Sequence, residues 1–211
     1  MTDPFAIDRE RMVAHLAARG VDDARVLNAM RAVPRHLFVP AALRAHAYDD
    51  RPLPIGAGQT ISQPLVVALT AQLCALGPDD VALEVGAGSG YQAAVLAQLC
   101  RRVYALEIRP ELAARARTNL LAAGVDNVVV GAGDGGHGWP EHAPYDAIAV
   151  AAAARTVPPP LVDQLADGGR LVIPLGAPDL QQLVRIVRRG DELERTEHGP
   201  VRFVAFVGDF G

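Results

Sequence analysis

The sequence of 211 residues contains no lysine: all 20 of its basic residues are arginine, against 24 acidic residues. Without a lysine ammonium, the chain cannot form a Schiff base with a carbonyl substrate, and it lacks the lysine of a phosphate-binding P-loop. The arginines are scattered along the chain, so no basic stripe or tail predicts binding to nucleic acid. We interpret the missing lysine as a compositional bias, because alanine is also abundant.

Cysteines and long apolar runs are also scarce. Cys74 and Cys100 lie far apart and form neither a CxxC motif nor part of a metal-ligand cluster, so we expect two buried free thiols and no metal. Residues 1–11 carry acidic side chains and no apolar run, unlike a signal peptide. Arg, Asp, Gly or Pro interrupts every apolar stretch before it could span a membrane. The sequence therefore predicts a soluble cytoplasmic protein without a membrane partner, and we expect a monomer.

Hydrophobic residues make up 50% of the chain, enough for the core of one α/β domain. We divide this domain into N-terminal helices with a loop (1–63), a central region (64–178) and a C-terminal hairpin (179–211). In the first part, one predicted helix stops at Gly20 and a second ends before Pro34. The connector 49–63, DDRPLPIGAGQTISQ, is too rich in proline and glycine for regular structure throughout, and such long loops are often functional.

From residue 81 onward, predicted strands alternate with predicted helices. Strands are expected at 81–85, 103–106, 127–130, 147–150 and 171–174, and helices at 91–99, 111–123 and 160–165. This alternation indicates a Rossmann-like, doubly wound sheet that is mostly parallel and covered on both faces. Residues 180–187 and 201–207 are expected to add an antiparallel hairpin at the sheet edge, joined by the polar turn 188–192.

A glycine-rich loop, EVGAGSGY at residues 84–91, follows the first of these strands and opens a helix. In that context, glycines let a nucleotide approach the main chain, and the helix N-terminus offers free N–H groups. The spacing is GxGxG rather than the GxGxxG of dinucleotide-binding enzymes. Glu84 lies in a strand that should be buried, so we expect it to bond the amides of the loop or the ammonium of a ligand.

Two acidic residues follow the next strands of the predicted sheet. Glu107 ends the second strand, where a carboxylate can accept hydrogen bonds from both ribose hydroxyls of a dinucleotide or of S-adenosylmethionine. Asp134 follows the third strand, where it either contacts an adenine amino group or only forms a turn with Gly135. The residues that we expect to contact the cofactor are Glu84, Gly86, Gly88, Ser89, Gly90, Glu107, Asp134 and Gly135.

These motifs together resemble a known family. VALEVGAGSGYQ, VYALEI, GDG followed by HGW, APYDAIAV and LADGGRLVIPLG are similar to the successive motifs of class I S-adenosylmethionine-dependent methyltransferases. The flanking segments VPRHLFVP, LPIGAGQTISQP and VRFVAFVG resemble the protein-L-isoaspartate O-methyltransferase family more specifically. The resemblance runs from about residue 11 to residue 207, with two departures: alanines at 151–154 replace Thr-Ala-Ala-Pro, and Ala205 replaces a proline.

The resemblance implies transfer of a methyl group from S-adenosyl-L-methionine to the free carboxylate of L-isoaspartyl and D-aspartyl residues in damaged proteins and peptides. S-adenosyl-L-homocysteine would be the product, and collapse of the ester to a succinimide would begin repair. Ser62 matches the active-site serine of the family, and residues 201–204 match the strand beside which its substrate pairs. We therefore expect the substrate to contact Thr60, Ile61, Ser62, Val201 and Phe203.

The expected chemistry needs no base, because a carboxylate is already ionised at neutral pH. Ser62 is predicted to hold this carboxylate and also to cap the helix that begins near Pro64, two roles that compete for one hydroxyl. His137 and His142 suggest neither a base nor a metal site.

Three alternatives stay open at this point. One is a related carboxyl methyltransferase that modifies a biosynthetic peptide, although no recognition extension is present. A second is a nicotinamide-dependent oxidoreductase, which the GxGxG spacing and the missing lysine disfavour. A third is a non-catalytic binding module, against which the intact Ser62, Glu107 and Asp134 argue.

Overall fold

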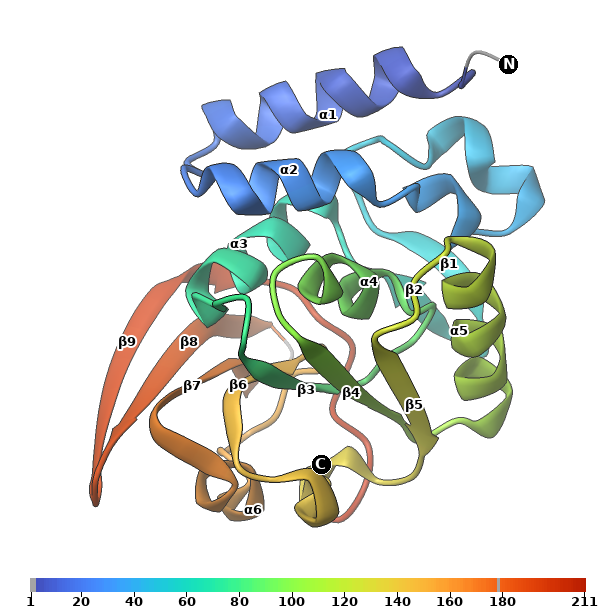
Figure 1. Ribbon diagram of the computed structural model, residues 1–211. Coiled ribbons are helices and arrows are strands. Elements are labelled where there is room, and N and C mark those ends of the chain that lie inside the picture. The colour runs from blue at the N-terminus through green and yellow to red at the C-terminus, as the bar shows by residue number, and fades with distance from the viewer. Residues whose placement is uncertain (1–2, 178) are drawn as a thin grey trace.

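The computed structural model describes residues 3–177 and 179–211, so the boundary predicted at residue 178 lies outside the described residues. Its main feature is a seven-stranded sheet, in which the first five strands in spatial order are parallel and the last two antiparallel. This arrangement confirms the predicted doubly wound sheet with an antiparallel edge (Figure 1). In spatial order, the strands are β5 (Val128–Ala132), β4 (Arg102–Glu107), β3 (Val81–Val85), β6 (Tyr145–Val150), β7 (Leu165–Ala177), β8 (Leu180–Arg189) and β9 (Glu192–Val201).

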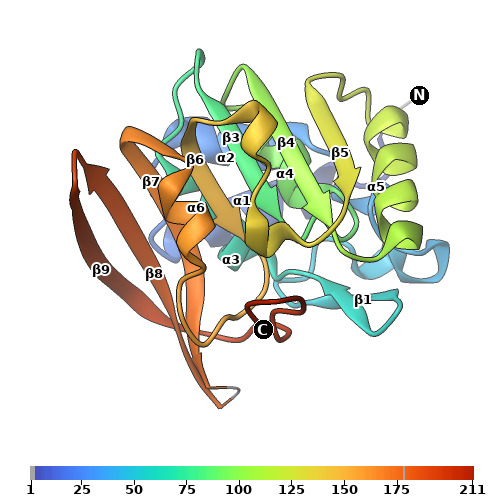
Figure 2. The same cartoon turned by 90° about the horizontal axis from the view of Figure 1, so that it is seen from below.

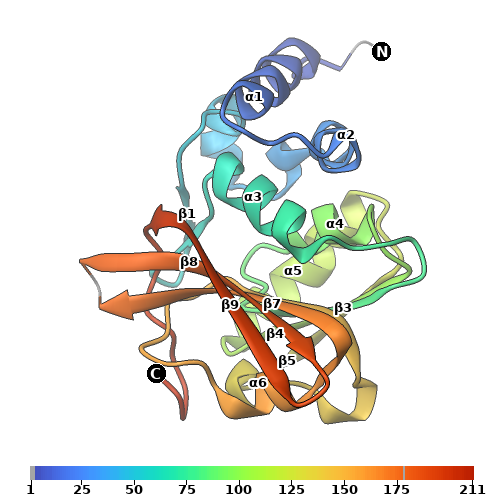
Figure 3. The same cartoon turned by 90° about the vertical axis from the view of Figure 1, so that its left-hand side faces the viewer.

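Helices cover both faces of the sheet, in layers that Figure 3 shows from the side. Next to one face lie α3, α4 and α5, with α1 and α2 as a further layer above α3 and α4 (Figure 1). On the other face lie α6 and two short 3₁₀ turns. The helices are α1 (Ala6–Ala18), α2 (Ala24–Ala32), α3 (Pro64–Cys74), α4 (Tyr91–Ala97), α5 (Pro110–Ala122) and α6 (Pro159–Asp163), and the 3₁₀ turns are η1 (Arg35–Leu37), η2 (Ala41–His46), η3 (Gly135–His137) and η4 (Pro140–His142). No helix in the described residues is both long and apolar enough to cross a bilayer.

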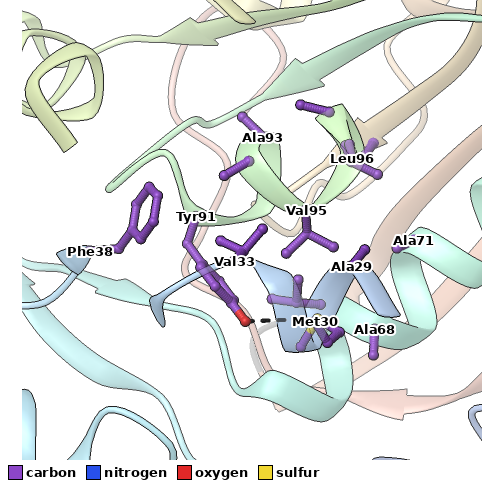
Figure 4. Close-up of a cluster of buried hydrophobic side chains, with 14 of the residues drawn as sticks. Ala29, Met30, Val33, Phe38, Ala68, Ala71, Tyr91, Ala93, Val95 and Leu96 are labelled. Carbon is purple, nitrogen blue, oxygen red and sulfur yellow. Dashed lines mark hydrogen bonds between the residues drawn. The ribbon is translucent and has the colours of Figure 1, made fainter. Parts of the chain in front are cut away.

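The strands divide the buried side chains into two clusters because successive residues of a strand point to opposite faces. Ala82 belongs to the cluster under the helical layers, whereas Leu83 belongs to the cluster on the side of α6. Within the first cluster, Tyr91 at the start of α4 packs edge-on against Phe38, with 5.6 Å between ring centroids (Figure 4). Its hydroxyl lies 3.8 Å from the sulfur of Met30 in α2. The N-terminal layer is thus attached directly to the helix that follows the glycine loop.

The connector at 49–63 is more regular than its composition predicts. Residues on either side of a glycine-rich turn form a short antiparallel hairpin, β1 (Leu53–Gly56) and β2 (Gln59–Ile61). Gly56 and Gly58 adopt positive φ angles of 92° and 70°, which glycine tolerates and which let the chain reverse. The hairpin delivers Ser62 directly to the start of α3.

The C-terminal strand was predicted in the wrong place. β9 is a polar strand at 192–201, and the apolar stretch that follows leaves the sheet at Val201. That stretch returns to the end of β6, where Ala153 donates its N–H to the carbonyl of Val204 (2.8 Å) and Phe206 donates to the carbonyl of Ala153 (2.8 Å). An edge strand needs no apolar face to pair through its backbone, so the hydrophobic pattern pointed to the wrong segment.

Candidate active site

A cleft opens at the carboxyl ends of β3, β4 and β6, where an α/β sheet of this kind binds its ligands. The β1–β2 hairpin and the C-terminal segment lie at this same end of the sheet (Figure 2). The cleft has a volume of about 830 Å³, including its open mouth, which is large enough for a nucleoside and an amino-acid side chain. Five stretches form its lining: residues 59–62, 84–92, 106–109, 151–152 and 204–207, together with Val67 and Gly135 but without Gly90.

The glycine loop crosses from β3 over the end of β4. The N–H groups of Gly86 and Ala87 both donate to the carbonyl of Leu106, at 2.8 and 3.0 Å. Gly88 donates its N–H to Glu107 Oε2 at 2.8 Å. These bonds tie the loop to the neighbouring strand, so its open side faces the cleft.

Glu107 is buried and held in place by two backbone donors. Besides the bond from Gly88, Oε1 accepts the N–H of Arg109 at 3.0 Å. Each carboxylate oxygen can accept a further hydrogen bond, and the residue lines the cleft. The geometry is that of a fixed acceptor pair, which suits a vicinal diol.

Glu84 lies on the floor of the cleft, fully buried. Neither of its carboxylate oxygens has a hydrogen-bond partner among the described residues, so the expected bonds to the amides of the glycine loop are not formed. Burial raises the pKa of Glu84 well above its ordinary value of 4.5. The nearby Gln92 side chain and the Ala93 N–H offset this rise in part, whereas the Glu107 carboxylate adds to it. The N–H groups of Gly86, Ala87, Gly88 and Gly90 bond Leu106, Glu107 and Ala87, so none of these four donates to Glu84.

Gln92 is a cleft residue that the sequence reasoning missed. It occupies the second position of α4, and both its amide oxygen and its amide nitrogen are buried without a partner in the described part of the chain. It lines the same cleft as Glu84. A polar residue directly after the glycine loop was the available signal, but such a residue is also common on the surface of a helix.

Asp134 lies beside the cleft rather than in its lining. One oxygen accepts the N–H of Gly136 at 2.8 Å and so caps η3, and the other accepts the N–H of Asp209 at 2.8 Å. Asp134, His137 and Asp209 bring three potential ligand atoms within 4.8 Å of one another, which the sequence did not indicate. Gly135 does line the cleft; a Cβ there would come within 2.5 Å of Val85.

The structure separates the two roles predicted for Ser62. The N-cap residue of α3 is Gln63, and its side chain makes no capping hydrogen bond. The acceptor in the first turn is Asp50, whose Oδ1 receives the N–H of Leu65 at 2.9 Å. The predicted helix cap by Ser62 is therefore wrong. In the described part of the chain the Ser62 hydroxyl makes no hydrogen bond, and it lines the cleft with Thr60 and Ile61.

The C-terminal wall of the cleft consists of residues 204–207. Val201 and Phe203 do not belong to the lining, so substrate contact through them stays a prediction. The backbone of Phe203 is already paired with Gln181, which receives its N–H at 2.7 Å and donates to its carbonyl at 3.2 Å. The wall itself is attached through Ala153, as described above.

Comparisons with known proteins agree with this geometry. The family model for protein-L-isoaspartate(D-aspartate) O-methyltransferase matches residues 7–210. A protein-L-isoaspartate O-methyltransferase of Methanoculleus marisnigri is 52% identical over 99% of this chain and 96% of its own length. A protein of the same description from a Synechococcus species is 54% identical over 98% of this chain and 88% of its own.

Two solved structures are also similar along nearly the whole chain. One, described as a protein-L-isoaspartate O-methyltransferase, has a TM-score of 0.87 and 29% identity over 96% of this chain and 67% of its own. The other, from Plasmodium falciparum and in complex with S-adenosyl-L-homocysteine, has a TM-score of 0.83 and 28% identity over 94% of this chain and 98% of its own. On the family model and the near-full-length relatives, this chain belongs to the protein-L-isoaspartate(D-aspartate) O-methyltransferase family.

Proposed function

We propose that this chain methylates the free carboxylate of L-isoaspartyl residues, and of D-aspartyl residues, in damaged proteins, so that the ester can collapse to a succinimide. The observation that carries the proposal is that one cleft combines a glycine loop and a fixed Glu107 with the uncommitted hydroxyl of Ser62. A cofactor half and a substrate half thus share one cavity. The family match favours this reaction over hydride transfer.

The residues present fit S-adenosylmethionine. Glu84 and Gln92 leave four buried polar atoms without partners in the cleft, and the ammonium and carboxylate of an amino acid are the complementary groups. Glu107 offers the fixed acceptors for a ribose, and Gly135, packed closely against Val85, lines the same cleft. When bound, the cofactor supplies a methyl group on a positively charged sulfur.

The task of the protein is then to hold an ionised carboxylate in line with that methyl group. The end of β6, which lines the cleft with Ala151 and Ala152, carries no polar side chain there. Among the described lining residues there is no histidine or cysteine, and an ionised carboxylate requires no base. In this proposal the Ser62 hydroxyl donates a hydrogen bond to the carboxylate and orients it.

The test uses an isoaspartyl peptide and its normal aspartyl twin. Methylation of the first alone supports the proposal, whereas equal labelling of both, or of neither, contradicts it. Replacing Ser62 with alanine removes one hydrogen bond to a charged group, worth about 1.5–3 kcal/mol, so kcat/KM should fall about tenfold to a hundredfold. Binding of S-adenosyl-L-homocysteine, measured by calorimetry, is the control and should not change. Full activity of Ser62→Ala would exclude the role of the hydroxyl.

The cytoplasmic location and the monomeric state expected from the sequence stay proposals. The second is tested by the mass of the purified chain in light scattering, where twice the mass of a 22.3 kDa protein would contradict it.

A further inference from the structure

Asp50 binds the chain on the far side of Ser62, outside the cleft. Its Oδ1 receives the N–H of Leu65 at 2.9 Å, and its Oδ2 receives the side-chain amide of Gln63 at 2.9 Å. Oδ2 also lies 3.1 Å from Nε2 of His15 in α1. One carboxylate therefore holds the first turn of α3 and connects it to the N-terminal layer.

Arg35 binds the chain at Ser62 itself. Its side chain is fully buried, its Nη2 donates to the carbonyl of Ser62 at 2.8 Å, and its Nε donates to the carbonyl of Ala47 at 2.7 Å. The guanidinium lies over the ring of Tyr91, 4.7 Å from its centroid. No carboxylate lies within ion-pair distance of it among the described residues, and its Nη1 has no hydrogen-bond partner there. Carbonyl dipoles, the aromatic face and the more distant Asp50 carboxylate stabilise this buried charge.

A free hydroxyl at the start of a helix is unusual, because the unsatisfied N–H groups of the first turn attract nearby side-chain oxygens. Ser62 is the hydroxyl residue nearest to Leu65 along the chain. Here the Leu65 N–H is already taken by Asp50, while the main chain of Ser62 is anchored by Arg35. The two contacts remove the competition for the hydroxyl and restrict where it can lie.

We propose that Asp50 and Arg35 are positioning residues of the active site: Asp50 caps α3 in place of Ser62, Arg35 anchors the Ser62 carbonyl, and together they keep the Ser62 hydroxyl free and aimed at the substrate carboxylate. This inference rests on the proposed role of Ser62. It gives the N-terminal layer a part in the reaction, although that layer contributes no side chain to the cleft.

A double-mutant cycle tests the proposal on the full-length protein with an isoaspartyl peptide. Asp50→Ala, Ser62→Ala and the double variant are compared, each below its own melting temperature. Without Asp50, the Ser62 hydroxyl turns to the Leu65 N–H, so Asp50→Ala should lower kcat/KM about tenfold or more. In the Ser62→Ala background the same substitution should cost less than about threefold, because no hydroxyl remains to be misplaced. The affinity for S-adenosyl-L-homocysteine should stay within about twofold in all variants.

Two further variants distinguish a positioning role of Asp50 from a general loss of folded structure. Asp49→Ala is the matched control, because Asp49 is the neighbouring acid. Among the described residues its side chain pairs with His46 and Arg51 at the surface and not with α3. The Asp49→Ala variant should therefore keep the wild-type kcat/KM. Asp50→Asn keeps an acceptor for the Leu65 N–H, and asparagine caps helices about as well as aspartate, so it should recover kcat/KM to within about threefold of the wild type.

Arg35→Lys keeps the charge but loses the planar fork that reaches two carbonyls, so KM for the peptide should rise about fivefold or more while the affinity for S-adenosyl-L-homocysteine is kept. If Asp50→Ala lowered kcat/KM equally in the wild type and in the Ser62→Ala background, the positioning role would be overturned, while the proposed role of Ser62 would stand. The positioning role is also overturned if Asp50→Asn is as poor as Asp50→Ala, or if Arg35→Lys leaves KM unchanged. Full activity of Ser62→Ala would instead overturn the role of Ser62 and this inference with it.

Discussion

At the scale of the residue, Glu84 is a buried carboxylate with no hydrogen-bond partner among the described residues. A buried carboxylate without partners is costly to ionise, and the raised pKa shows that the folded chain favours its neutral form. Glu84 lies in the central strand β3, where an apolar residue would stabilise the fold more. Glu84 lowers the stability of the ligand-free protein and lines the cleft, a combination that is typical of residues kept for function at a cost in stability.

Glu84→Gln should stabilise the protein without ligand at high pH. Because the pKa of Glu84 is raised in the folded state, its contribution to stability is complete below the ordinary value of 4.5 and is lost as the pH rises through the folded pKa. Glutamine cannot ionise, so the variant should melt about 2–4 °C above the wild type at pH 8, for a gain of about 1 kcal/mol, and the difference should shrink toward pH 4.

The same substitution should weaken binding of S-adenosyl-L-homocysteine about tenfold, since an amide, unlike the carboxyl group of Glu84, cannot ionise to pair with the ammonium of the ligand. Thermal melts between pH 4 and pH 8 and calorimetric titration check both parts. Glu141→Gln is the control, because Glu141 is exposed and outside the cleft, and it should change neither quantity. A Glu84→Gln variant that melts below the wild type at pH 8 would contradict the account.

At the scale of elements, packing against α5 constrains the residues of the glycine loop as much as the backbone turn does. Gly90 has a φ of 87° and begins α4, and a Cβ there would lie 3.3 Å from Ala116 and from Leu120 of α5. Its φ favours glycine, and a Cβ there would be tight against α5 unless that helix shifted by a few tenths of an ångström. Gly90 therefore acts through packing rather than as part of the cleft lining.

Comparing Gly90→Ala with Gly124→Ala separates these two constraints. Gly124 has a similar φ of 70°, but a Cβ there would meet nothing within 4 Å. Gly124→Ala should cost only the backbone strain, about 1 kcal/mol, whereas Gly90→Ala adds crowding and should cost about 3 kcal/mol. Urea unfolding at equilibrium measures both free energies. Equal losses would show that the packing of α5 adjusts freely.

At the scale of the whole molecule, the cleft depends on segments from both ends of the chain. The hairpin before α3 contributes residues 59–61 to the lining of the cleft, and the C-terminal wall contributes residues 204–207. No described residue of the outer strand β9 belongs to the cleft lining; the strand lies at the far edge of the sheet and most of its residues are exposed. Ligand binding should therefore affect regions distant in sequence and spare a large part of the sheet.

Hydrogen exchange with and without S-adenosyl-L-homocysteine tests this view. A ligand that binds the native state suppresses local opening around its site, so exchange should slow about tenfold or more at 84–92, 106–109 and 204–207. It should not slow at 192–200. NAD, which shares the adenosine but not the amino-acid part, should protect little. Protection by NAD equal to that by S-adenosyl-L-homocysteine would instead support a nicotinamide-dependent enzyme.

Local patterns were enough to predict the parallel part of the sheet and the positions of the glycine loop and Glu107 at its carboxyl end. The parallel strands form continuous apolar runs because both faces are buried, and the glycine loop and Glu107 follow them at fixed spacing. The polar edge strand β9 was not predictable in this way, because it is stabilised by backbone pairing with β8 and has no apolar face. The apolar residues after it pack against β6 instead.

The sequence alone determined the features that depend on residues close together along the chain. These are the order of strands and helices, the glycine loop, the acid at the end of β4 and the family. Only the tertiary structure decided which groups remain available for chemistry. Asp50 reaches Leu65 and Arg35 reaches Ser62 across 15 and 27 positions, and these contacts free the Ser62 hydroxyl. Glu84 and Gln92 have no hydrogen-bond partner among the described residues, because the fold buries both in one cleft where the N–H groups of the glycine loop at 86–88 bond other acceptors. No local pattern contains that information, because hydrogen-bond partners are assigned only once distant segments are packed together.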